Sequence, residues 1–230
     1  MTIRFFCFLA AISVWAQTPA AVPQRAAKPA VPAPNEAKKV AGKAKAEAAL
    51  GDTSSAVRDY AATTAQLPLP QYVLEYGELL QSMGRAAQAQ EQYRLLTAEQ
   101  SLMAAGGVLD DLTASQVAAD HGDPADAVRH AQAEWDRRHS VLVADALAWA
   151  LHKDGRDTEA LGFARQAGAL GWHNATFEYH RGAIEDALGL KEQARADLAE
   201  ALKTNAHFSP LQAGDARREL ARLTGTGATP

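Results

Sequence analysis

The sequence predicts an all-α protein, a right-handed α-solenoid of about five helical hairpins with a capping helix at its C-terminal end. Five glycines that recur at intervals of 33, 38, 33 and 34 residues are each followed five residues later by an alanine. Apolar residues also recur at three- and four-residue spacing through alanine-rich tracts, which is typical of stacked amphipathic helices. The glycine–alanine pairs are Gly51 and Ala56, Gly84 and Ala89, Gly122 and Ala127, Gly155 and Ala160, and Gly189 and Ala194.

A small residue lies 12 positions before each of these alanines. Two antiparallel helices joined by a short turn approach closely only where both carry small side chains. We therefore interpret each glycine as the turn of a hairpin, and each pair of small residues as the crossing point of its two helices. The upstream residues are Ala44, Gly77, Ser115, Ala148 and Gly182.

The first 16 residues have the pattern of a signal peptide, with Arg4 before an apolar run from Phe5 to Val14 and a small-x-small exit ending at Ala16. The apolar run is too short to span a bilayer as a helix, which needs about 20 residues. We expect export to the periplasm or the medium, and no membrane insertion once the signal is removed. Retention of the segment as an anchor is the alternative.

The predicted domains follow from composition. An Ala/Pro-rich linker is expected at 17–36, the repeat array at 37–207, a capping helix at 208–223 beginning with Ser209-Pro210, and a disordered tail at 224–230. The 38-residue interval contains 104–107 (AAGG), which we expect to form a lengthened turn between the second and third units, with a hinge as the alternative. The predicted units of the array are about 37–69, 70–103, 108–140, 141–174 and 175–207.

The array resembles the tetratricopeptide repeat (TPR) family, in which small residues mark the helix crossing and large residues fill the second helix. Tyr60, Tyr93, Phe163 and Leu198 are the large residues of the second helices here. The resemblance is best in 72–99, 142–170 and 177–205. The first unit departs from it, because 43–47 (KAKAE) is charged where apolar residues are usual.

Composition excludes several classes of function. The formal charge is −4, and it becomes −5 when residues 1–16 and their one arginine are removed, with no block of like charges. This argues against nucleic acid as a partner. The only cysteine, Cys7, lies in the signal segment, so the mature chain forms no disulfide.

Sequence motifs for metal binding and for catalysis are also missing. All seven histidines lie between 121 and 207, but none pairs with another at i, i+4 beside a carboxylate, and no cysteine completes a zinc set. There is no G-x-S-x-G sequence and no glycine-rich phosphate loop. We therefore expect no metal, no cofactor and no enzyme activity.

The TPR resemblance implies a binding surface on the concave face, which first helices line at fixed positions around the small crossing residue. We expect Trp149, His152 and Tyr179 to share one wall, with Glu78, Asp145 and Asp186 as acceptors, a combination suited to an extended peptide with a basic or hydrogen-bonding side chain. Ordinary packing between repeats is the alternative for both Trp149 and Tyr179. The ten predicted partner-binding residues are Leu74, Glu78, Gln81, Leu112, Gln116, Asp145, Trp149, His152, Tyr179 and Asp186.

The functional prediction is an exported scaffold that binds a protein or peptide partner on this concave face. A structural or accessory subunit of a cell-envelope complex, contacting partners through the ends or the outer face of the array, is the alternative. That alternative predicts loss of binding when the helix at 211–223 is changed. An enzyme with an unrecognised site is a more remote possibility.

Overall fold

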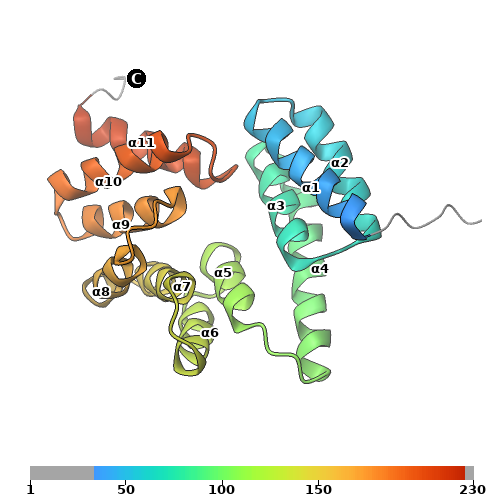
Figure 1. Ribbon diagram of the computed structural model, residues 1–230, viewed down its shortest axis with the longest axis horizontal. Coiled ribbons are helices and arrows are strands. Elements are labelled where there is room, and N and C mark those ends of the chain that lie inside the picture. Colours follow the sequence, from blue (N-terminus) through green and yellow to red (C-terminus); the bar gives the residue numbers. More distant parts are fainter. Residues whose placement is uncertain (1–33, 226–230) are drawn as a thin grey trace, which may run out of the picture. The chain divides into compact units, whose positions relative to one another are not determined.

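The computed structural model describes residues 34–225, and within that range it contains eleven α-helices and no β-strand (Figure 1). The predicted signal peptide, the linker up to residue 33 and the end of the tail lie outside the described residues. The helices are α1 (Pro34–Ala49), α2 (Thr53–Gln66), α3 (Pro70–Ser82), α4 (Ala86–Ala105), α5 (Asp111–His121), α6 (Pro124–Arg137), α7 (Val141–Lys153), α8 (Asp157–Gly168), α9 (Ala175–Ala187), α10 (Lys191–Thr204) and α11 (Gln212–Thr224).

The first ten helices pack as five consecutive pairs, and α11 packs on α10 and α9 (Figure 1). The boundaries differ slightly from the sequence prediction. Helix α1 takes in residues 34–36 of the expected linker, and α11 includes Thr224, the first residue of the expected tail. The first unit is helical although it is charged, because its lysines lie at the surface. There Lys43 pairs with Asp59, and Lys45 pairs with Glu75.

All ten small residues at the predicted crossings are buried. The glycines in this set are sites of very close approach: a Cβ on Gly77 would lie 2.5 Å from the Tyr93 ring, and one on Gly182 would lie 2.9 Å from Cγ of Leu198. The large residues of the second helices therefore fill the space that a side chain at the crossing would need.

Four of the five repeat glycines adopt the left-handed conformation that ends a helix, with φ between 74° and 85°. Gly122 is the exception, with φ of −136°. Here Asp123 accepts a hydrogen bond from the backbone N–H of Ala125, and Pro124 opens α6, so the chain turns through an extended cap. Glycine relieves crowding at this turn, since a Cβ on Gly122 would lie 3.0 Å from Cα of Ala118, a tighter contact than side chains usually make.

The 38-residue interval contains the weakest junction between consecutive helices in the described part of the chain. Helices α4 and α5 pack only slightly against each other. The contact at this junction is a small apolar cluster formed by Val73 of α3, Leu96 of α4 and Val117 of α5. One larger core lies within α1–α4 and another extends through α5–α11. The predicted lengthened turn is therefore also the place where the hydrophobic core divides.

Candidate functional site

Two adjoining pockets follow the first helices of successive pairs and the start of α11, and the larger has a volume of about 700 Å³. They share Glu78, Asp120, Trp149 and Gln212, so we treat them as one surface, called the groove. The charged, histidine and aromatic side chains of the groove are Lys45, Glu75, Glu78, Asp120, His121, Asp145, Trp149, His152, Lys153, Tyr179, His180, Asp215, Arg218 and Glu219.

Trp149 forms the packed floor of the groove. Only 6% of it is exposed, and its ring stacks on His180 with centroids 4.1 Å apart and lies 5.6 Å from the ring of Tyr179. Its indole N–H donates to Asp120 of α5 at 3.0 Å. Tyr179 is also buried and lies 5.6 Å from the ring of Phe208. Both aromatic residues thus lie where the sequence predicts, but packing between repeats accounts for most of their surface.

Asp145 is buried against the same aromatic floor. Nδ1 of His180 lies 3.0 and 3.1 Å from its two carboxylate oxygens, and neither residue is solvated. Nε2 of His180 is buried without a hydrogen-bond partner. The pair has the imidazole and carboxylate of a catalytic triad, but no nucleophile stands at the second nitrogen. It joins α7 to α9 and leaves Asp145 unavailable as the expected acceptor.

Glu78 and Gln81 form the α3 side of the groove. Gln81 accepts a hydrogen bond from the Tyr93 hydroxyl at 2.8 Å, and the Tyr93 ring stacks on His121 at 4.0 Å. An oxygen of Glu78 lies 3.9 Å from Nε2 of His121. Burial is the main cause that raises the pKa of Glu78, and the charge of Asp120 adds to it.

Helix α11 forms the opposite side. The side-chain amide of Gln212 donates to Asp120 at 3.1 Å, which joins the start of α11 to α5. Asp120 is therefore held by two other helices, because Lys153 and Trp149 of α7 also bind it: the Lys153 ammonium lies 3.6 Å away, and the Trp149 indole donates to it. Burial, followed by the charges of Asp186 and Asp215, raises the pKa of Glu219.

Of the other predicted residues, three line the groove and two lie outside it. Leu74 and Gln116 line the groove beside Glu78, while His152 lines it and lies 2.5 Å from a carboxylate oxygen of Asp157. Asp186 is outside both pockets and pairs with Arg222 of α11. Leu112, in the first turn of α5, is partly exposed and is also outside both pockets.

The groove carries an excess of negative charge. Its titratable side chains include six carboxylates, three cations and three histidines. Each cation is already matched by a carboxylate, Lys45 by Glu75, Lys153 by Asp120 and Arg218 by Asp215. Glu78, Asp145 and Glu219 form no ion pair with a lysine or arginine of the groove, although the charge of Arg218 acts on Glu219 and lowers its pKa. The pKa of the Tyr179 hydroxyl is raised by burial and by the surrounding carboxylates.

Several groove residues were not predicted from the sequence. Asp120, His121 and Lys153 lie one or more positions beyond those that the resemblance assigns to the concave face. A search for charged residues in the last turn of each first helix would have found all three. The residues of α11 carried no such signal, because this helix lies outside the repeats whose positions define the concave face.

Comparison with solved structures supports the fold. A tetratricopeptide repeat protein from Parabacteroides merdae matches with a TM-score of 0.53 and 18% identity, covering 82% of this chain and 71% of its own. The C-terminal part of a TPR repeat-containing protein from Cytophaga hutchinsonii matches with a TM-score of 0.37 and 12% identity, covering 83% and 84%. The match to the Parabacteroides merdae protein shows that the chain has the fold of TPR proteins, and the eleven helices of the described residues confirm the all-helical prediction.

No protein-family model matches the sequence, and no curated protein sequence is similar enough to count as a relative. Among residues 34–225, none of the helices combines the length and the apolar character that crossing a bilayer requires.

Proposed function

We propose that the protein is an exported interaction scaffold whose groove binds a protein or peptide segment through a lysine or arginine side chain. Proteins with the TPR fold generally bind proteins or peptides, and repeat arrays present an extended surface suited to this. The observation that carries the proposal is the unmatched negative charge of the groove, concentrated at Glu78 and Glu219.

The electrostatics favour a cationic partner for a specific reason. The pKa values of Glu78 and Glu219 are raised because burial and neighbouring carboxylates disfavour their charged forms. A bound ammonium or guanidinium group would relieve that repulsion, so these carboxylates interact more favourably with a cation than fully solvated ones do. Tyr179 and Trp149 provide an apolar wall for the aliphatic part of the same side chain.

The test uses charge variants rather than truncation of the aromatic floor. Labelled protein is applied to an array of short random peptides, and bound peptides are expected to be enriched in lysine and arginine. Glu78→Gln and Glu219→Gln should each weaken binding, while Glu159→Gln, on the exposed face of α8, should not. Peptides that bind wild type and both groove variants equally well would refute the groove as the binding surface.

Export rests on residues 1–16, which lie outside the described residues. We propose cleavage after Ala16, on the signal-peptide pattern of the sequence. Expression of the full chain in a bacterial host should give a periplasmic product whose mass corresponds to an N-terminus at Gln17. An intact Met1 in a membrane-associated fraction would favour a retained anchor.

One observation favours the alternative of contacts made through outer surfaces. Leu102, Val108 and Leu109, at the end of α4 and in the following turn, are 76%, 52% and 66% exposed. Exposed apolar groups gathered at one place commonly mark an interaction surface. Loss of a partner in a Leu102→Ser, Leu109→Ser double variant, with Glu78→Gln unaffected, would support that alternative over the groove.

A further inference from the structure

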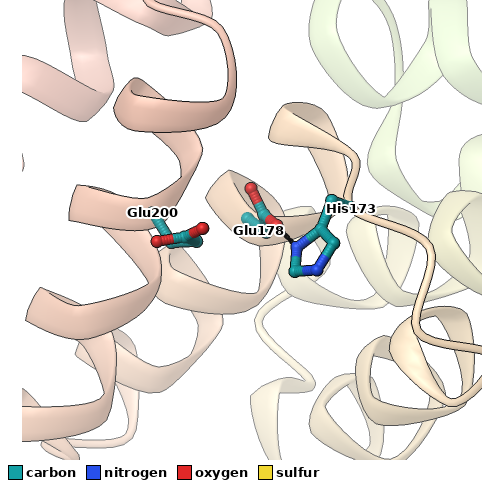
Figure 2. Close-up of side chains that lie close together, drawn as sticks. All are labelled: His173, Glu178 and Glu200. Atoms are coloured by element: carbon teal, nitrogen blue, oxygen red, sulfur yellow. Dashed lines mark hydrogen bonds and ion pairs between the residues drawn. The ribbon is translucent and has the colours of Figure 1, made fainter.

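We propose that His173, Glu178 and Glu200 form a binding site for one divalent transition-metal cation, with Zn²⁺ the best match. One ligand atom from each residue lies within 4.8 Å of the others. Figure 2 shows His173 and Glu200 on either side of Glu178. The site lies away from the groove, and none of its residues lines that surface.

No metal is expected from the sequence, because no pair of histidine ligands is spaced along one helix. These three ligands come from different elements: His173 from the turn before α9, Glu178 from the first turns of α9, and Glu200 from α10. Only the packing of α10 against α9 brings the two glutamates together. An expectation based on local spacing could not include such a site.

Glu178 gives the independent reason to infer a cation. It is only 7% exposed, yet its Oε2 is buried without a hydrogen-bond partner. A buried carboxylate oxygen without a donor is unfavourable, because its water has been removed and nothing has replaced it. A cation held at this carboxylate would supply the missing interaction.

The distance between the first two ligands suits a shared metal. Nδ1 of His173 lies 3.4 Å from Oε1 of Glu178. That is longer than the usual N–H···O hydrogen bond, which spans about 2.7–3.2 Å. Two ligands bound to Zn²⁺ at about 2.0–2.1 Å with tetrahedral angles lie about 3.3 Å apart. Nitrogen and carboxylate oxygen together are also ligands that Zn²⁺ accepts.

The turn that carries His173 is fixed on both sides. The edge of the Trp172 ring packs on Phe177 with centroids 5.4 Å apart, and the side chain of Asn174 caps α9 by accepting from the backbone N–H of Thr176 at 2.9 Å. His173 itself is exposed, so its ring can turn about a fixed backbone position. The backbone of the turn therefore holds His173 beside Glu178, while its exposed ring is not fixed by packing.

Lys203 would compete with the metal cation for Glu200. Its ammonium lies 2.8 and 3.0 Å from the two oxygens of Glu200, in an exposed pair one helical turn apart. Exposed pairs of this kind are weak, so a dication can replace the ammonium at Glu200. This arrangement makes an unusual prediction: removing a lysine near the site should tighten metal binding.

The test is calorimetric titration of ZnCl₂ into the chelator-treated full chain. One saturable site is expected, with affinity at least tenfold weaker in His173→Ala and Glu200→Gln and tighter in Lys203→Ala. Glu178→Gln should abolish binding while circular dichroism shows an intact helical content. His207→Ala, which removes an exposed histidine from the turn before α11, is the matched control and should leave the affinity unchanged.

Two results would overturn the proposal. One is the absence of saturable binding by the wild-type chain at millimolar ZnCl₂. The other is an affinity that neither His173→Ala nor Glu200→Gln changes, since Zn²⁺ would then be bound by other histidines. Because His173 is exposed and Glu200 is partly exposed, we expect these variants to keep the fold, so that a change in affinity reports on the site itself.

Discussion

Glu185 makes the stability of α9 and α10 depend on pH. This side chain is 5% exposed, and its Oε2 is buried without a hydrogen-bond partner. Burial, together with the nearby charge of Asp197 on α10, raises its pKa from the usual 4.5 to about 7, although Arg181 opposes the shift. The native state therefore holds a proton here that the unfolded chain has already lost between these two pH values.

The sign of the effect follows from proton linkage. A carboxyl group whose pKa is raised in the folded state stabilises the fold below the unfolded pKa, and that contribution is lost as the pH rises through the folded pKa. A shift from 4.5 to about 7 corresponds to at most about 3 kcal/mol. Since Glu185 lines a shallow surface pocket that water can enter, we expect about 1–2 kcal/mol.

The perturbation is Glu185→Gln, which keeps the shape of the side chain, removes the titration and adds a donor toward Asp197. We expect this variant to match wild type at pH 4.5 and to be about 1–2 kcal/mol more stable at pH 8.5, equivalent to a Tm higher by about 3–6 °C. Thermal unfolding followed by circular dichroism across this range measures both. Glu192→Gln, an exposed position on α10, is the control. A Glu185→Gln variant with the same pH dependence as wild type would refute the reasoning.

Three further predictions concern packing and capping. Gly77→Ala should lower the free energy of unfolding by about 1–3 kcal/mol, because the Tyr93 ring must move. Gly162→Ala, with open space around it in α8, should raise it by up to about 1 kcal/mol. Chemical denaturation of both variants measures this contrast. Trp149→Ala should lower the stability by about 3–5 kcal/mol, and an unchanged Tm would contradict its place in the core. Asp52→Ala removes the cap that accepts from Ser55 and should destabilise by about 1 kcal/mol, seen as faster hydrogen exchange at the start of α2.

The repeat itself was predictable because its signal is local. A turn glycine and two small crossing residues at fixed offsets are direct consequences of hairpin geometry, so Gly77 and Gly182 identified their crossings without any long-range information. The exception at Gly122 arises from the following Asp123-Pro124, which favours an extended cap over a left-handed one. The turn itself lies at the predicted glycine, and only its backbone conformation differs from that of the other four.

The site was less predictable, since its properties depend on contacts between distant segments. The resemblance placed Trp149 and Tyr179 on the concave side, but their burial depends on His180 of α9, Asp120 of α5 and Phe208 of the turn before α11. No spacing rule within a repeat indicates that such neighbours will cover an aromatic side chain. For the same reason, Asp145 was expected to be an acceptor and is instead paired inside the protein.

The position of α11 changes which experiment separates the two functional hypotheses. From sequence, altering 211–223 was expected to impair only contacts made through the ends or outer face. In the structure, Gln212, Asp215 and Glu219 of this helix line the groove, so changes there would impair either mode of binding. The informative comparison is between Glu78 on α3 and the apolar residues Leu102 and Leu109, because Glu78 lines the groove, whereas Leu109 lines a separate pocket at the turn after α4. A partner lost only with Glu78→Gln binds in the groove; a partner lost only with the leucine variant binds outside it.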